Sequence, residues 1–203
     1  MELDFQNFFL PVILFAFVMS ATPGPNNIML TASGANYGFR RSIPHMLGIT
    51  FGFLSLISAV AAGLGAVFMA WPPLQTALKV AGSLYLCYLA WRIATAEPGS
   101  ASTQGSGRPL TFLEAALFQY ANPKAWIMAI SAVSAFTAGG DTYVATAIGV
   151  ALTCSLVNLP SISLWAGFGV AIGRILETPR AWRWFNRTMG ALTAACVLLI
   201  VLD

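Results

Sequence analysis

Long runs of apolar residues, separated by short polar or Gly- and Pro-rich segments, make up almost the whole chain. A helix needs about 20 apolar residues to cross the hydrocarbon core of a bilayer. The runs are long enough for this, and we predict an all-α integral membrane protein with six transmembrane helices. The predicted helices span residues 8–37, 43–70, 74–94, 112–136, 143–173 and 185–202.

Two of the six runs are interrupted by prolines. The first contains Thr22-Pro23-Gly24-Pro25-Asn26-Asn27, and the fourth contains Ala121-Asn122-Pro123-Lys124. Proline removes a backbone donor and clashes with the preceding turn, and glycine relaxes the backbone, so we expect helices 1 and 4 to be broken. In lipid, the polar groups that a break frees must face protein or a water-filled cavity. Paired breaks of this kind are typical of transporter binding sites.

The two interrupted runs begin two similar halves. Each half contains three predicted helices, an odd number, so the second half would enter the membrane upside down, as an inverted-topology repeat. We predict one transmembrane domain over residues 1–203, with repeat 1 at 1–95, a cytoplasmic linker at 96–111 and repeat 2 at 112–203. Each break lies about 12 residues, or about 18 Å of helix, before the end of its run. In a hydrocarbon core about 30 Å thick, this places both breaks near the midplane.

The composition supports a membrane protein and excludes several partners. Hydrophobic residues make up 58% and charged residues 8% of the 203 positions, and the mean hydropathy is +0.76. A soluble domain carries about 25% charged residues. The net charge of +3 is too small to indicate a nucleic-acid partner. The three cysteines lie singly in apolar runs without metal or redox spacing, so we expect neither a metal site nor a cofactor.

Arginine and lysine are distributed unevenly between the predicted loops. The loops after helices 1, 3 and 5, with their edges, contain Arg40, Arg41, Arg92, Arg108, Arg174, Arg180, Arg183 and Arg187. The opposite side has only Lys79. By the positive-inside rule, the arginine-rich loops are cytoplasmic and both termini face the periplasm or the exterior. Contact of these arginines with anionic lipid headgroups is a further expectation.

The paired breaks and the residues around them resemble the LysE/RhtB family of bacterial amino-acid exporters. The resemblance rests on Thr22-Pro23-Gly24-Pro25, Gly38, Arg40-Arg41, Gly48-Ile49-Thr50-Phe51-Gly52, Asn122-Pro123-Lys124-Ala125, Trp184-Phe185-Asn186-Arg187 and Gly190. It extends over essentially the whole chain. It implies a proton-coupled secondary exporter of amino acids or related small metabolites in the bacterial inner membrane. The apolar run after Lys124 ends in Ser134-Ala135-Phe136, where many members have Pro-Gln-Phe, so the resemblance leaves the substrate open.

Lys124 is the first candidate for substrate binding. A lysine near the bilayer centre costs at least about 2.5–3.5 kcal/mol on insertion scales, so its presence there needs a reason. In one interpretation, the ammonium faces a cavity and attracts the carboxylate of the substrate. In the other, it donates hydrogen bonds to carbonyls freed by Pro123 or by the break in the other half. One ammonium can do both in different states.

The polar residues beside the prolines complete the candidate site. A new half-helix starts after Pro25, and its first amides lack partners inside the helix and favour an anion. The side chains of Asn26 and Asn27 either hold a substrate ammonium or cap the helix. The remaining candidates for substrate binding beside the breaks are Thr22, Gly24 and Asn122. Thr22 and Asn122 either cap a helix or bind the substrate. The prolines themselves, Pro23, Pro25 and Pro123, are structural.

A third polar position lies in the fifth run. Asn158 is followed closely by Pro160 and Ser161, which predicts a polar kink in an apolar helix. Asn158 either lines the transport path or bridges to a neighbouring helix through a hydrogen bond. We include it among the candidate substrate-binding residues.

Two residues are candidates for carrying a coupling proton. No Asp or Glu lies in the middle of a predicted helix, and the nearest acid is Glu114, near the cytoplasmic start of helix 4. His45, at the start of helix 2, has an unperturbed pKa that suits a proton switch. The alternative for His45 is an ordinary side chain at the membrane interface. The substrate itself is a further candidate for carrying the proton.

These features favour a transporter that works by alternating access around two broken helices, and not an enzyme. An enzyme would need a nucleophile–base pair or a metal cluster at depth, and the sequence offers neither. The alternative is a channel, or a metal or small-solute permease of the same architecture, although Lys124 would repel cations. We expect a neutral amino acid as the substrate.

Glycine pairs predict close helix packing. Gly48 and Gly52, and likewise Gly169 and Gly173, form small-xxx-small pairs. Such pairs let two helices approach closely within a chain or between two copies. A homodimer is therefore a further expectation.

Overall fold

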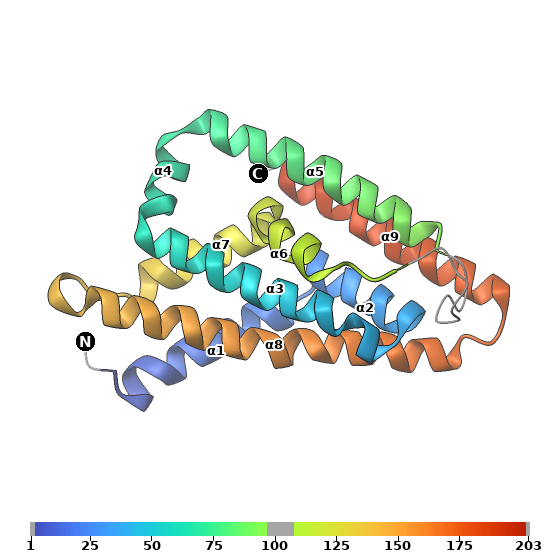
Figure 1. The fold of residues 1–203 in the computed structure, drawn as a ribbon, viewed down its shortest axis with the longest axis horizontal. Helices are drawn as coiled ribbons and strands as arrows, with labels where there is room; N and C mark the ends of the chain where they lie inside the picture. The colour runs from blue at the N-terminus through green and yellow to red at the C-terminus, as the bar shows by residue number, and fades with distance from the viewer. Residues whose placement is uncertain (1–2, 97–107, 202–203) are drawn as a thin grey trace.

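Helices are the only regular elements in residues 3–96 and 108–201, the part of the chain that the computed structural model describes (Figure 1). The elements are η1 (Phe5–Phe9), α1 (Leu10–Ala21), α2 (Pro25–Tyr37), α3 (Phe39–Ala59), η2 (Val60–Leu64), α4 (Gly65–Ala70), α5 (Pro72–Ala94), α6 (Phe112–Ala121), α7 (Pro123–Phe136), η3 (Gly140–Thr142), α8 (Tyr143–Ile175) and α9 (Pro179–Val201). The prediction of an all-α membrane protein is confirmed. Most of the predicted linker, residues 97–107, lies outside the described residues.

Two helical stretches, Phe39–Ala70 and Gly140–Ile175, are long and apolar enough to cross a membrane by themselves. A third appears when Phe5–Ala21 and Pro25–Tyr37 are taken together as one bent span, with an angle of 62° between the two parts. These counts refer to the described residues only, and six spans remain a prediction. The first stretch is not one regular helix, because Gly63 takes a φ of 108° that favours glycine, and this kink was not expected.

The two expected helix breaks are present. α1 ends at Ala21, and α2 begins at Pro25 after an extended Gly24. α6 ends at Ala121, and α7 begins at Pro123. In both cases a proline occupies the first position of the new helix, where its fixed φ fits and its missing N–H would have had no partner. By contrast, α8 continues through Pro160 as one helix.

Glycines bring the broken helices into backbone contact with their neighbours. Gly48 and Gly52 on α3 pack against α6, and a Cβ added at Gly52 would lie 2.6 Å from Cα of Ala116. Gly169 and Gly173 on α8 pack against α2 in the same way. Small residues are required where helix backbones approach this closely. The expected glycine pairs are therefore used within the chain, which leaves these faces unavailable to a second copy; a dimer itself stays a prediction.

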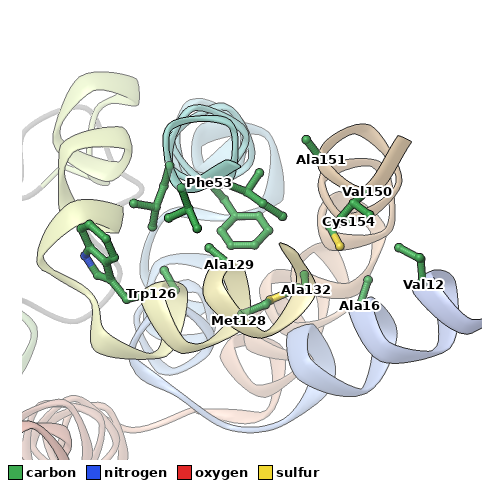
Figure 2. Packing of buried hydrophobic residues seen from close by; sticks show 14 of the residues in the cluster. Val12, Ala16, Phe53, Trp126, Met128, Ala129, Ala132, Val150, Ala151 and Cys154 are labelled. Atoms are coloured by element: carbon green, nitrogen blue, oxygen red, sulfur yellow. The ribbon is translucent and has the colours of Figure 1, made fainter. Parts of the chain in front are cut away.

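Two apolar clusters divide the bundle at the breaks. One joins α1, α3, α7 and α8, and Figure 2 shows Phe53 of α3 beside Ala129 of α7 and near Cys154 of α8. The other joins α2, α3, α5 and α6 with parts of α8 and α9, around Leu30, Ile49 and Phe118. Each broken pair gives one half-helix to each cluster. The breaks therefore lie where the two clusters meet.

The arginine-rich segments gather at one end of the molecule. The ends of α2, α5 and α8 and the starts of α3 and α9 lie together at the right of Figure 1. These segments contain seven of the eight arginines of the predicted cytoplasmic side, and the eighth, Arg108, lies in the segment before α6. The arrangement agrees with a single basic face, although the direction of insertion stays a prediction.

Candidate functional site

Lys124 connects the two breaks. Its Nζ donates hydrogen bonds to the carbonyl oxygen of Thr22 at 2.6 Å, to Oγ1 of Thr22 at 2.8 Å and to the carbonyl oxygen of Pro23 at 3.3 Å. The last carbonyls of a helix have no partner within it, and they form the negative end of the helix dipole. An ammonium is therefore a favourable partner for the end of α1. The side chain is half-buried.

Asn27 and Thr22 close the end of α1. Nδ2 of Asn27 donates to the carbonyl oxygens of Ser20 at 2.9 Å and Thr22 at 2.7 Å, and Oγ1 of Thr22 donates to the carbonyl oxygen of Met19 at 3.0 Å. These bonds satisfy carbonyls that the break leaves free. In this conformation both side chains cap the end of α1, whereas the start of α2, where capping by Asn27 was expected, has no side-chain cap.

Asn26 pairs with a residue that the sequence analysis did not select. Its Nδ2 donates to Oε1 of Gln119 at 2.9 Å, and Nε2 of Gln119 donates back to Oδ1 of Asn26 at 3.3 Å. Gln119 is almost fully buried in α6, where its Nε2 also donates to the carbonyl oxygen of Ala115. A glutamine in an apolar run, three residues before Asn122, was a signal for this contact. The pair joins the first half of the chain to the second.

Asn122 and Gly24 position the lysine. Oδ1 of Asn122 accepts a hydrogen bond from the backbone N–H of Lys124 at 3.2 Å and caps α7. A Cβ added at Gly24 would lie 2.8 Å from Cδ of Lys124. The absence of a side chain at Gly24 thus lets the lysine reach the end of α1.

Asn158 on α8 joins this group from a third direction. Its Nδ2 donates to Oγ of Ser20 at 3.1 Å, which is the helix bridge that one interpretation expected. Its Oδ1 is buried and has no hydrogen-bond partner. Buried polar atoms are nearly always paired, so this acceptor is available to a ligand or a water molecule.

These side chains surround one small cavity, which we call the break cavity. Its volume is about 30 Å³, and its lining includes Gly24, Asn26, Asn27, Asn122, Lys124 and Asn158 together with Gln119. Thr22 does not line it but holds Lys124 at its edge. A space of this size admits a water molecule or two. Six residues from three parts of the sequence thus converge, in a conformation that is closed to an amino acid.

The two proton candidates lie outside the break cavity. Glu114 accepts hydrogen bonds from Arg108 at 2.6 and 2.7 Å and from the backbone N–H of Thr111 at 2.8 Å, in a capping box at the start of α6. The Glu114 carboxylate raises the pKa of the Arg108 guanidinium above its ordinary value. In this conformation, Glu114 caps the start of α6 and forms an ion pair with Arg108.

His45 is not the exposed interfacial side chain that the sequence suggested as an alternative. It is 1% exposed in α3, and both of its ring nitrogens lack a hydrogen-bond partner. The interfacial interpretation is wrong because α2, the end of α5 and the segment before α6 surround the start of α3. Within the described part of the chain, no three His, Cys, Asp or Glu residues are grouped as metal ligands would be.

Comparisons with known proteins identify a family of related sequences. A family model described as "LysE type translocator" matches residues 17–202. Cysteine/O-acetylserine efflux proteins of Shigella flexneri serotype 5b and Escherichia coli K12 are each 27% identical over 196 residues, which cover 94% of this chain and 98% of theirs. No solved structure shows a significant match.

Proposed function

The chain belongs to the LysE type translocator family, and from this we propose that it exports a neutral amino acid, or a closely related metabolite, from the bacterial cytoplasm. Cysteine and O-acetylserine are the substrates to test first, because curated relatives are named for their efflux. Because the chain belongs to a translocator family, it is a transporter and not an enzyme. The observation that carries the proposal is the Lys124 ammonium, held by the opposite break beside a polar cavity.

The chemistry of binding follows from the contacts of Lys124. An amino acid carries one carboxylate and one ammonium. The carboxylate would replace the Thr22 and Pro23 carbonyls as the partner of Lys124, and the freed carbonyls would accept hydrogen bonds from the substrate ammonium. The exchange adds no net charge to the membrane interior. The open Oδ1 of Asn158 is a further acceptor for that ammonium.

Transport would proceed by alternating access. We propose six transmembrane helices in two inverted repeats, with both breaks near the midplane, both termini outside and the arginine-rich end in the cytoplasm of a bacterial inner-membrane protein. The break cavity is too small for an amino acid in this conformation, so the half-helices must separate to admit one. Glycine contacts between α3 and α6 and between α8 and α2 provide surfaces for small sliding movements.

Proton coupling is a further part of the proposal. It follows from the family resemblance, and neither Glu114 nor His45 lines the break cavity. A proton on either residue would therefore act through the packing of α3 against α6, which contain them. Protonation of the substrate is the other route.

The test is efflux from vesicles that contain the purified protein. Vesicles are loaded with labelled O-acetylserine, cysteine or other neutral amino acids, and efflux is followed with and without an inward proton gradient. We expect saturable efflux of one substrate class, stimulation by the gradient, and counterflow. Efflux without saturation or counterflow would indicate a channel instead. Folded protein that releases none of these amino acids would reject the substrate class.

A further inference from the structure

A second and larger cavity lies at the arginine-rich end of the molecule. It has a volume of about 310 Å³ and is formed by α2, the start of α3, the end of α5 and the segment before α6. We call it the basic-end cavity. Its volume lies in the range of small-molecule sites, about 300–1,000 Å³, whereas the break cavity is an order of magnitude smaller.

His45 lines this cavity and has no hydrogen-bond partner on either ring nitrogen. The neighbouring buried polar side chains do have partners. Oγ of Ser33 lies 2.7 Å from Oγ of Ser42, and the amide of Asn36 exchanges hydrogen bonds with that of Asn186 at 2.8 and 3.1 Å. A buried imidazole without partners is unfavourable, so a molecule in the cavity that pairs with it would relieve that penalty.

The charges around the cavity favour a carboxylate. The lining includes Arg92 and Arg108. Arg108 is paired with Glu114, whereas Arg92 donates one hydrogen bond to the carbonyl oxygen of Arg108 at 3.1 Å and lies over the ring of Tyr88. Two guanidinium groups against one carboxylate leave the rim positive.

We propose that the basic-end cavity is a reception site that binds the exported amino acid before it reaches the break cavity, with His45 as a substrate-binding residue. A neutral imidazole has one donor and one acceptor nitrogen. Both nitrogens are covered in this conformation, so a turn of the ring would bring one of them to the cavity, as a donor to the carboxylate or an acceptor from the ammonium, while Arg92 attracts the carboxylate. This inference rests on the proposed function for the identity of the ligand and for the cytoplasmic position of the cavity.

One face of α2 connects the two cavities. Asn26 lines the break cavity, and Met29 and Ser33 line the basic-end cavity, at spacings of three and seven residues along the same helical face. Met29 is buried in the apolar cluster with Leu89 and Leu110, which also line the basic-end cavity. Met29 is unbranched and flexible, which suits a side chain that must move to let the substrate pass.

The experiment measures binding and efflux separately, with O-acetylserine and cysteine as probes. Binding is measured on the full-length protein in lipid nanodiscs, and efflux on the same variants in vesicles. His45→Met removes both nitrogens and puts an apolar side chain in place of the imidazole. Because it loses a hydrogen bond to a charged group, we expect weaker binding and a higher KM by about tenfold or more, with a maximal efflux rate within about twofold of the parent. His45→Gln, which keeps a donor and an acceptor, should restore part of the affinity.

Thr50→Val is the matched control. Thr50 lies on the same helix, and its Oγ1 is likewise buried without a partner, but it lines neither cavity. A change in stability alone should therefore appear in both variants, whereas a change in binding and KM should appear only at His45. His45→Gln also keeps the test valid if His45→Met does not fold.

The outcomes separate this site from the proposed function. Lys124→Met should abolish efflux and leave His45-dependent binding in place. Binding and KM that are unchanged in both His45 variants, or no binding of either probe to the parent protein, would overturn the reception site. Binding that depends on His45, in a protein that exports neither probe, would support an amino-acid site in the basic-end cavity and reject the proposed function.

Discussion

The two helix breaks, between α1 and α2 and between α6 and α7, contribute opposite chemistry. The first break extends over three residues, bends the chain by 62° and presents the carbonyls of Thr22 and Pro23. The second consists of Asn122 alone and supplies the cation, Lys124. The first break thus supplies hydrogen-bond acceptors, and the second break supplies the donor. Each half completes the other, so a substrate that separates them must replace these bonds.

Removal of the cation should have the largest effect. Lys124→Met leaves the carbonyls at the end of α1 without their ammonium and the substrate carboxylate without its partner. We expect efflux to fall by about a hundredfold or more, because loss of one partner of a partly buried charged contact is severe. Initial efflux rates from vesicles with equal amounts of folded protein measure the loss.

Lys79→Met is the control for Lys124→Met. It removes the same charge from α5, at a residue that lines neither cavity. Its efflux should match that of the parent protein. Equal losses in both variants would mean that the total charge matters and not the position at the break.

Filling the space at Gly24 should have the next largest effect. The backbone there is extended and any residue can adopt it, so Gly24→Ala tests only the close approach of Lys124. We expect efflux to fall by about tenfold, as for an overpacked contact, while the lysine moves away from Thr22. Gly139→Ala, where an added Cβ meets no atom within 4 Å, should leave efflux unchanged. Parental efflux in Gly24→Ala would show that the lysine does not need this path.

The bridge between Asn26 and Gln119 should have a smaller effect. Asn26→Leu, Gln119→Leu and the double variant form a cycle in which each single variant removes the partner of the other amide, although Gln119 keeps its hydrogen bond to the carbonyl oxygen of Ala115. We expect a coupling free energy of about 1 kcal/mol in denaturant unfolding, with the double variant less destabilised than the sum of the single ones. Additive losses would show that the two amides do not support each other.

Glu114→Gln should have the smallest effect. It weakens the capping box of α6 and the exposed ion pair with Arg108, and we expect stability to fall by about 1 kcal/mol. The stimulation of efflux by an inward proton gradient should persist, because Glu114 is engaged with Arg108 and Thr111. Loss of that stimulation with normal basal efflux would assign proton coupling to Glu114.

Local sequence chemistry predicted the breaks, and it left two roles open for Lys124, one of which was a contact with the break in the other half. Pro25 and Pro123 occupy the first positions of new helices, as proline requirements alone indicate. The contact of Lys124 with Thr22 joins residues 102 positions apart. Which of two plausible roles a lysine takes depends on how the halves pack, and no local pattern contains that information.

Gln119 and His45 are two further residues whose surroundings the sequence did not predict. Gln119 lies in an apolar run and was overlooked because its hydrogen-bond partner, Asn26, lies 93 residues earlier in the chain. An interfacial position was one interpretation of His45 because the residue lies at the start of a predicted helix, whereas the structure buries it. Burial of a residue near a helix end is decided by its tertiary neighbours, and sequence periodicity does not report them.

Dependence of transport on the substrate carboxylate tests the central claim most directly. Efflux of labelled O-acetylserine is compared with that of its methyl ester, which keeps the ammonium and lacks the carboxylate, in the parent protein and in Lys124→Met. We predict rapid efflux of the free acid and little of the ester from the parent, and little of either from the variant. Equal efflux of acid and ester from the parent, or an undiminished preference for the acid in Lys124→Met, would contradict the role of Lys124 as the carboxylate partner at the breaks.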